Sequence, residues 1–596
     1  MTDDTSGSAP ADASALFQQA QALAQSGDSA QAAGIYRRAA DLGHPASAYM
    51  LGQMMAAGLC GSAEEGTFWL AVSSVDGYQP ARDALASLPR YPKDEDLLAL
   101  ADGLAEAGSP AAMAAAGMCR ILGIGTAIDP EGAYALFKKA SEAGNATAQA
   151  AAGLCLIRGA GVSRDKAAGL EELRKAHEKN VSLFASIEYA GCLERGDAGE
   201  KDPGAAFAIY SALADRKEPL GAYHMGRCYM DGVGTQEDPY MAFSWFLVAQ
   251  TMGAAEGDYG MARCLMGGVG TDRESKKGYD LLVKSANRGC REAMMMAGQL
   301  SQRGRIAKKD AKAAFNWFLR AAETGSAPGN LAAGDCLAHG NGVKKDEKAA
   351  FTCYLRGALL GSVQCAYYAG NALLSGNGVK RDEKRGFQLC LLAADDGLMK
   401  AQFTVANCYA RGRGVKRNSK KAIELHKGLA EKGYIKSMQY VGESYYNGDG
   451  VAADPEEAIK YLRMGAEKGD FLCEYYMGDA CTSGRGVPKD PKQAEEWYKK
   501  AAAQGHILSQ KILDAKGISY GGKKEVSPFE SFLKSAKNGD AQSMYIVGRY
   551  YEDGIGMEKD LEQAKVWYGG AAKKGNEAAK RALESIREKE ESTAKQ

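Results

Sequence analysis

The sequence carries no excess of charge of either sign, since its 596 residues include 74 Lys and Arg against 74 Asp and Glu. Proteins that bind nucleic acid or a membrane surface usually need a basic excess, so neither class is expected. No apolar run approaches the ~20 residues of a membrane-spanning helix. The first residues also lack the basic and apolar segments of a secretory signal. Composition therefore predicts a cytoplasmic protein without membrane insertion.

Catalytic and metal-binding patterns are missing as well. The six histidines never form H-x-x-x-H or H-E-x-x-H, and no two of the 14 cysteines form C-x-x-C. These spacings are the usual sequence signs of a zinc site, so no metal is expected. No histidine and nucleophile form a recognisable catalytic constellation. We therefore expect neither enzymatic activity nor a cofactor.

Proline is scarce, with 15 residues, whereas glycine is abundant, with 73, and regularly spaced. A glycine that opens a short loop recurs every 36 residues. Each unit contains two apolar-periodic segments of the length of short helices, so the sequence predicts a chain of helix pairs. The loop glycines are Gly196, Gly232, Gly268, Gly304, Gly340, Gly376, Gly412, Gly448 and Gly484.

Three positions of the unit indicate how it folds. A small residue six positions before the loop glycine, such as Gly226, allows the two helices to approach closely. The loop glycine, such as Gly232, supplies the left-handed conformation that ends a helix. An acidic residue before proline, as in Asp238-Pro239, caps the start of the second helix.

The stretch NGDGVAADPEEA, residues 447–458, could be a calcium loop, a phosphate-binding loop or a turn. It lacks the oxygen-ligand spacing of an EF-hand and the Gly-Lys-Ser/Thr of a phosphate-binding loop. We therefore predict a turn closed by Gly448 and Gly450, followed by a helix that Asp454 caps.

Several cysteines recur near the repeat interval. Four of them lie two residues after the small mid-helix residue: Cys228, Cys264, Cys336 and Cys408. Equivalent positions one repeat apart should be about 10 Å apart, beyond the ~7 Å Cα limit for a disulfide. The sequence predicts free thiols that fill the space between helices.

Residues 222–253, AYHMGRCYMDGVGTQEDPYMAFSWFLVAQTMG, and residues 473–505 resemble Sel-one-like repeats, which are relatives of tetratricopeptide repeats. The likeness covers residues 110–575. It implies an all-α fold, an α-solenoid that winds as a right-handed superhelix of about 15–16 tandem helix-turn-helix repeats. Proteins of this family commonly act as adaptors or scaffolds.

The repeat register divides the chain into six segments. Residues 78–107 interrupt it with three prolines, and residues 506–540 lose the loop. The predicted segments are a disordered tail (1–12), degenerate helical repeats (13–108), regular repeats (109–505), an irregular repeat (506–540), a C-terminal repeat (541–576) and a charged capping helix (577–596).

In the related tetratricopeptide fold, the first helix of each pair lines the concave face, and the residue after the small mid-helix residue points into it. The resemblance therefore gives a row of candidate partner-binding residues. They are Arg227, Arg263, Gln299, Asp335, Asn371, Asn407, Glu443 and Asp479. All are polar, which suits either peptide recognition through hydrogen bonds or a solvated face without a ligand.

The predicted function is a non-enzymatic scaffold or adaptor that binds a peptide or helix of a partner protein in the concave groove. Two alternatives stay open. One is a regulatory subunit of an envelope or polysaccharide-synthesis complex. The other is an anion-binding protein that uses residues 380–436, where 14 Lys and Arg stand against 6 Asp and Glu.

Overall fold

The computed structural model describes residues 12–88, 93–304, 309–520, 528–554 and 558–594, and these segments contain 33 helices and no strand. Most of these helices pack in consecutive pairs, and α33 (Glu577–Ala594) follows the last pair. The predicted all-α solenoid of paired helices is confirmed. The tail predicted for residues 1–12 lies outside the described residues except for Asp12, whose side chain caps α1. Of the helices described, none combines the length and apolar character needed to cross a bilayer.

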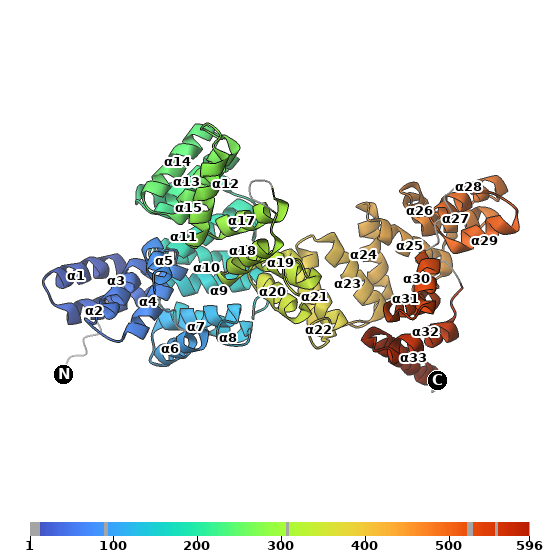
Figure 1. Ribbon diagram of the computed structural model, residues 1–596, viewed down its shortest axis with the longest axis horizontal. Helices are drawn as coiled ribbons and strands as arrows, with labels where there is room; N and C mark the ends of the chain where they lie inside the picture. Colours follow the sequence, from blue (N-terminus) through green and yellow to red (C-terminus); the bar gives the residue numbers. More distant parts are fainter. Residues whose placement is uncertain (1–11, 89–92, 305–308, 521–527, 555–557, 595–596) are drawn as a thin grey trace. The chain divides into compact units, whose positions relative to one another are not determined.

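The chain divides into two compact units, Met1–Asp396 and Gly397–Gln596, which are treated separately (Figure 1). Unit 1 contains α1 (Ala13–Gln25), α2 (Ser29–Asp41), α3 (Pro45–Ala56), α4 (Ala63–Val75), α5 (Gln79–Ala86), α6 (Asp94–Glu106), α7 (Pro110–Leu122), α8 (Pro130–Glu142), α9 (Ala146–Arg158), α10 (Lys166–Glu178), α11 (Leu183–Arg195), α12 (Pro203–Asp215), α13 (Pro219–Asp231), α14 (Pro239–Thr251), α15 (Ala255–Gly267), α16 (Ser275–Asn287), α17 (Arg291–Arg303), α18 (Ala311–Glu323), α19 (Ala327–His339), α20 (Glu347–Leu359), α21 (Val363–Ser375) and α22 (Glu383–Asp395).

Unit 2 contains α23 (Met399–Arg411), α24 (Ser419–Glu431), α25 (Ile435–Asn447), α26 (Pro455–Glu467), α27 (Phe471–Ser483), α28 (Pro491–Ala503), α29 (Ile507–Ala515), α30 (Pro528–Lys537), α31 (Ala541–Asp553), α32 (Leu561–Lys573) and α33. The boundary between the units falls inside the segment 109–505, which the sequence treats as one regular array. The first and second helices of a pair are called the A helix and the B helix below.

The loop between the A and B helices is built on two glycines. Helix α13 ends at Gly232, and both Gly232 and Gly234 are left-handed, with φ of 68° and 67°. A Cβ atom on Gly234 would lie 2.2 Å from the carbonyl oxygen of Pro203, the first residue of the preceding B helix. The second glycine therefore also allows the backbones of consecutive repeats to touch.

The stretch 447–458 has the same construction. Gly448 and Gly450 are both left-handed, with φ of 78°. The Asp454 side chain accepts a hydrogen bond of 3.0 Å from the backbone N–H of Glu457 and so caps α26. The stretch is a turn and a helix cap, as predicted.

The small mid-helix residue leaves space for a side chain of the B helix. A Cβ atom on Gly226 would lie 2.6 Å from the ring of Phe246, and one on Gly478 would lie 2.7 Å from the ring of Tyr498. These rings are buried, at 0% and 2% exposure. In these repeats one large side chain fills the space left by the small residue, whereas Gly370 lies against the smaller Cys390 and the backbone of Gly386.

All 14 cysteines are free thiols, and 12 of them are buried. Cys228, for example, is fully buried between α11, α12 and α13, in a cluster with Ala190 and Tyr210. Burial raises the pKa of its thiol to about 11, so the thiol stays protonated and unreactive near neutral pH. The predicted role of the cysteines as small core residues is confirmed.

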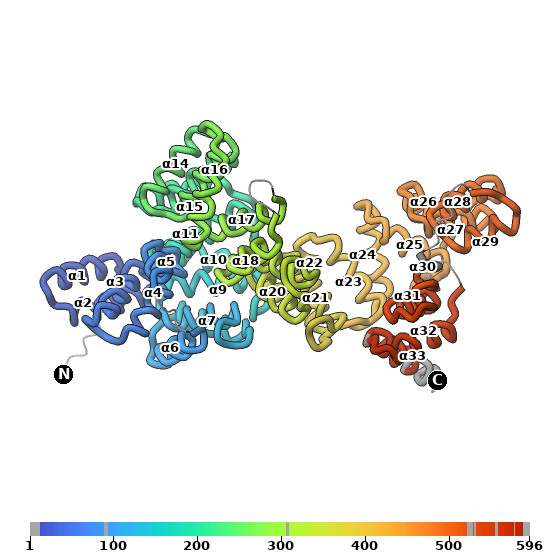
Figure 2. The backbone as a smooth tube through the Cα atoms, viewed as in Figure 1, coloured from blue at the N-terminus to red at the C-terminus, as the bar shows by residue number. Residues whose placement is uncertain are grey.

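In unit 1 the end of α4 packs against much later helices (Figure 2). The buried carboxylate of Asp76 accepts hydrogen bonds from the hydroxyls of Ser182, at 2.6 Å, and Thr147, at 2.9 Å. Ser182 caps α11 and Thr147 lies in α9. Burial outweighs these hydrogen bonds and raises the pKa of Asp76 to about 7.

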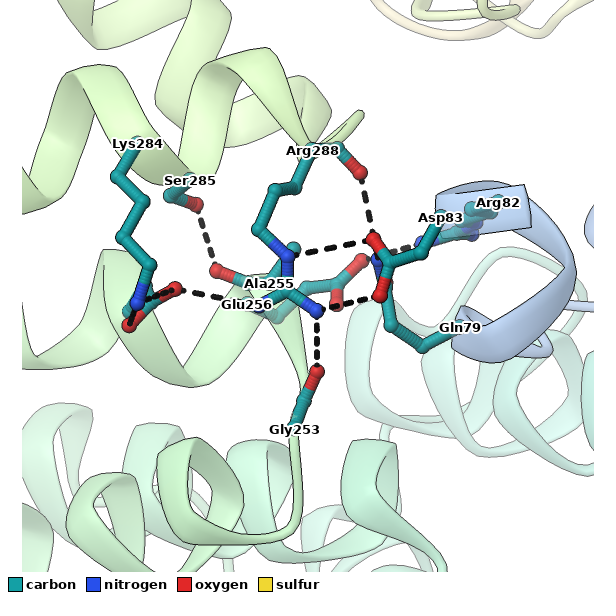
Figure 3. A network of polar contacts seen from close by, with 10 residues as sticks. Gln79, Arg82, Asp83, Gly253, Ala255, Glu256, Lys284, Ser285 and Arg288 are labelled. Atoms are coloured by element: carbon teal, nitrogen blue, oxygen red, sulfur yellow. Dashed lines mark hydrogen bonds and ion pairs between the residues drawn. The ribbon is translucent and has the colours of Figure 1, made fainter. Parts of the chain in front are cut away.

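The short helix α5 continues this contact toward α15 and α16. Arg82 forms an ion pair of 2.8 Å with Glu256, and Arg288 forms one of 2.7 Å with Asp83 (Figure 3). Arg288 also lies 3.3 Å from the buried Asp258. We call Arg82, Asp83, Glu256 and Arg288 the α5 clasp. It joins residues that are 174 and 205 positions apart in the sequence.

Candidate partner-binding cavity

Unit 1 contains a partly open cavity of about 2190 Å³. Its wall includes side chains of α4, of the A helices α7, α9, α11, α15 and α17, and of α20–α22. Helices α12–α14 contribute no residue to the wall, and the chain lines the cavity again from α15 onward. Apolar residues such as Met118, Met295 and Leu392 share the wall with charged ones.

A second set of polar contacts closes the wall where α20–α22 meet α7–α10. Arg164 and Lys166 bind Asp396 at 2.6 Å and 3.0 Å. The guanidinium of Arg356 donates a hydrogen bond of 3.1 Å to the carbonyl oxygen of Gly123. We call these five residues the α22 clasp; all of them, together with Arg82 of the α5 clasp, line the cavity.

The eight candidate residues from the sequence are divided between the two units. Arg227, Arg263, Gln299, Asp335 and Asn371 belong to unit 1, and Asn407, Glu443 and Asp479 belong to unit 2. None of them is buried, and Gln299 is exposed. Arg263 and Gln299 line the cavity of unit 1, whereas Arg227, Asp335 and Asn371 are not among its lining residues.

Arg227 is held by its own neighbours. Its guanidinium binds both carboxylate oxygens of Glu194, one of them at 2.7 Å, and lies over the ring of Tyr210 at 5.7 Å from the centroid. Burial disfavours the charge of Glu194, but the Arg227 guanidinium outweighs this and lowers the pKa of the carboxyl. Arg227 therefore has a structural role that the sequence did not indicate.

Two acidic candidates accept hydrogen bonds from tyrosines. The hydroxyl of Tyr354 donates to Asp335 at 2.8 Å, and that of Tyr446 donates to Asp479 at 2.6 Å. Burial, followed by these acidic neighbours, raises the pKa of both tyrosines. The contacts fix the carboxylates in place, where each still has acceptor capacity for a further donor.

Glu443, in unit 2, is a candidate whose carboxyl has a shifted pKa. Its side chain is half-buried, and the loss of water around the carboxyl raises its pKa to about 7, although a hydrogen bond of 3.0 Å from Gln439 opposes the shift. Arg263, in unit 1, keeps a loose ion pair with Asp231 at 3.6 Å. Arg263 is thus freer than Arg227 to meet a partner.

Residues one and two helical turns before the candidate position also line the cavity, and they were not among the predicted site residues. Met295 and Arg291 stand four and eight residues before Gln299 and line the same wall. At the candidate position itself, the earlier repeats carry Met118 and Leu154, which also line the cavity. The helical period would have revealed the first pair, while the restriction to polar residues hid the second pair.

The charged residues of the wall have both signs. Several pair within the wall, such as Arg195 with Asp197 at 2.8 Å and Arg158 with Glu188 at 3.9 Å. The cationic lining residues are Arg82, Arg158, Arg164, Lys166, Arg195, Arg263, Arg291 and Arg356, and the acidic ones are Asp94, Glu188, Asp197, Glu292, Glu323 and Asp396. Such a mixed surface suits a protein segment better than a polyanion.

The basic segment 380–436 is split by the unit boundary, since residues 380–396 belong to unit 1 and residues 397–436 to unit 2. Within unit 2, the ammonium group of Lys421 lies 4.6 Å from the ring centroid of Tyr409. Across the described residues, no three His, Cys, Asp or Glu side chains gather closely enough to hold a metal ion.

The chain matches the family model of the Sel1 repeat. The match covers residues 22–44, 110–145, 146–178, 184–217, 219–249, 255–290, 291–326, 327–362, 363–398, 400–434, 435–470, 472–506 and 541–576. The matched segments make up more than half of the chain, and they leave out residues 45–109 and 507–540, where the register is irregular. No curated protein sequence matches the chain.

Solved structures with similar helical repeats include a protective antigen of uropathogenic Escherichia coli with an SLR fold. It is 22% identical, with a TM-score of 0.43 over 83% of this chain and 90% of that one. A Sel1 repeat protein from Oxalobacter formigenes is 26% identical, with a TM-score of 0.38 over 59% and 95%. Yeast Tom70 is 14% identical, with a TM-score of 0.24 over 85% and 98%.

Proposed function

We propose a function from one premise: the chain belongs to the Sel1 repeat family. Repeat proteins of this kind generally mediate contacts between proteins. This chain acts as a non-enzymatic scaffold, and a peptide or helix of its partner lies in the cavity of unit 1. Arg263 and Gln299 are the contacts best placed for this role, because both line the cavity.

The size and lining of the cavity carry the proposal. Small-molecule pockets usually measure about 300–1000 Å³, whereas this cavity measures about 2190 Å³. A helical or extended protein segment fills such a space and meets both its apolar and its charged walls. The remaining candidates occupy the same repeat position outside the cavity lining, and we propose them as separate partner contacts within each unit: Arg227, Asp335 and Asn371 in unit 1, and Asn407, Glu443 and Asp479 in unit 2.

The test is affinity capture from native lysate with a charge-reversed wall. Arg263→Glu/Arg291→Glu changes two cavity residues that have no close ion pair within the wall. Lys276→Glu/Lys277→Glu makes the same charge change on the exposed face of α16 and is the matched control. We expect a defined partner to be retained by the wild type and the control. The amount of partner recovered with the cavity variant should fall about tenfold.

Equal recovery by all three proteins would overturn the cavity assignment. In that case, loss of the partner from a Lys416→Glu/Lys420→Glu variant, together with competition by a polyanion, would favour the anion-binding alternative. Matching thermal melts of the four proteins would show that the substitutions leave the repeats folded.

A further inference from the structure

Helix α14 is a B helix whose outward face is apolar. Its sequence, PYMAFSWFLVAQT, contains no charged residue. Tyr240 is 75% exposed, and Met241, Leu247 and Val248 are 39–42% exposed. These four are among only ten large apolar side chains that are exposed in the described residues. Such clustering is typical of a surface that another protein covers.

The B helices of the later repeats carry charge at the position of Tyr240. Where α14 has Tyr240, the equivalent residues in later repeats are Lys276, Lys312, Lys348, Lys384, Lys420, Glu456 and Lys492. The next B helix, α16, has Lys276, Lys277 and Lys284 in place of Tyr240, Met241 and Val248. The repeat fold therefore does not require apolar side chains at the positions of Tyr240, Met241 and Val248, so they need another explanation.

The preceding B helix, α12, extends this face with small uncharged residues. Gly204, Ala208 and Ala212 occupy the positions of Tyr240, Ser244 and Val248, and all three are exposed. Trp245 of α14 packs in one apolar cluster with residues of α12, so the two helices lie together. A ridge on α14 thus lies beside a low, neutral shelf on α12.

A ridge beside a shelf is self-complementary under a two-fold axis, because the ridge of each copy can lie on the shelf of the other. The ridge and shelf positions carry no charge, so two copies would bury no unpaired charge between them there. A partner with an ordinary charged surface would leave its own charges desolvated against this face. We propose that α12 and α14 form the interface of a two-fold symmetric homodimer.

This interface would leave the proposed cavity free. None of Tyr240, Met241, Leu247 or Val248 lines the cavity. A dimer would therefore present two cavities and could bind two segments of one partner with increased avidity. The dimer itself does not depend on the function proposed for the cavity, and its test uses the purified chain alone.

The test is the mass in solution over a range of protein concentrations. The wild type should reach twice the chain mass of 63.1 kDa as the concentration rises. Tyr240→Lys/Val248→Lys copies the residues that α16 carries at these positions, so the fold should tolerate it. The dimer dissociation constant should rise about 100-fold, roughly tenfold for each of the two substituted α14 helices in the interface.

The control is Val566→Lys, which charges an apolar residue that is 65% exposed on α32. It should dimerise like the wild type. Hydrogen exchange of residues 239–251 should also slow as the wild type associates. A wild type that stays monomeric at all concentrations would overturn the proposal and assign the face to a different protein. So would a dimer that the α14 variant leaves intact, or exchange in α14 that does not change with concentration.

Discussion

The two units are built from the same repeat but are held together differently. In the described part of unit 2, the polar contacts assigned between side chains reach about one repeat along the chain, as in Tyr446–Asp479 and Lys436–Asp470, 33 and 34 residues apart. In unit 1, contacts such as Arg288–Asp83 and Arg164–Asp396 join residues 205 and 232 positions apart. Unit 1 therefore adds long-range closure to an architecture that works by nearest-neighbour stacking in unit 2.

This difference should appear in how each unit unfolds. A solenoid with only neighbouring contacts has a stability close to a sum of repeat and interface contributions, so it can open from any point. Closure by the two clasps links the opening of early repeats to that of late ones. We expect unit 1 to lose its protection from hydrogen exchange as a larger cooperative block than unit 2.

Opening the α5 clasp should have the largest effect. Arg82→Met removes the partner of Glu256, whose side chain is 11% exposed and would remain as a buried, unpaired carboxylate. The expected loss is about 3 kcal/mol in the free energy of unfolding of unit 1. Peptide-resolved hydrogen exchange should show faster exchange in α5, α15 and α16, with unit 2 unchanged.

Two variants sharpen this result. Arg82→Met/Glu256→Met removes both charges and should recover most of the lost stability. Lys436→Met, in unit 2, removes the exposed cation of a one-repeat ion pair. It should cost less than about 1 kcal/mol, with only local effects, because the buried Asp470 keeps its hydrogen bonds from the backbone N–H groups of Leu472 and Cys473. If Arg82→Met costs as little stability as Lys436→Met and changes exchange only locally, the α5 clasp does not couple early repeats of unit 1 to late ones.

The pH dependence offers a second way to separate the units. The raised pKa of Asp76, about 7, means that the folded unit binds this proton more tightly than the unfolded chain does. Between pH ~4 and ~7 the stability of unit 1 should therefore fall as the pH rises, by up to about 1.4 kcal/mol per pH unit. Asp76→Asn keeps the side chain neutral and should remove this slope.

Glu443 is the matching acid in unit 2, with a pKa also raised to about 7. Its hydrogen-bond partner, Gln439, lies in its own helix, whereas Asp76 bonds to α9 and α11. Glu443→Gln should therefore change exchange only around α25. Asp76→Asn should change it in α4, α9 and α11 together. Denaturant melts from pH 4.5 to 7.5 measure the pH dependence of stability for each variant, and hydrogen exchange shows which helices change. If both variants change exchange only in their own helix, the predicted difference between the units is wrong.

The sequence predicted the repeat but not the closure, for a physical reason. Left-handed glycines, N-caps and small mid-helix residues act within one or two repeats, so their spacing is enough to predict helix pairs. Asp83 and Arg288 meet only because many small rotations between repeats add up around the cavity. The interruption at residues 78–107 was visible in the sequence, but the packing of α5 on α15 and α16 was not.

The candidate site follows the same division. The position after the mid-helix residue was identified from the repeat pattern as exposed. In the structure only Gln299 is exposed, and the other seven members are half-buried. Which repeats turn that position toward the cavity depends on the winding of unit 1. Arg227 and Arg263 are equivalent in sequence, yet the first pairs with Glu194 and the second lines the cavity.

The smallest expected difference concerns the helix caps, which are the same in both units. Asp238 caps α14 in unit 1, and Asp454 caps α26 in unit 2, each through backbone N–H groups at 2.9–3.0 Å. Asp238→Ala and Asp454→Ala should each cost about 1 kcal/mol, and the corresponding Asn variants, which keep an acceptor, should cost less. Hydrogen exchange should accelerate in the first turn of the affected helix alone. If an Ala variant instead speeds hydrogen exchange throughout a unit, the caps take part in the coupling between repeats. The helix caps would then not be local, and the distinction between local stacking and long-range closure would be wrong.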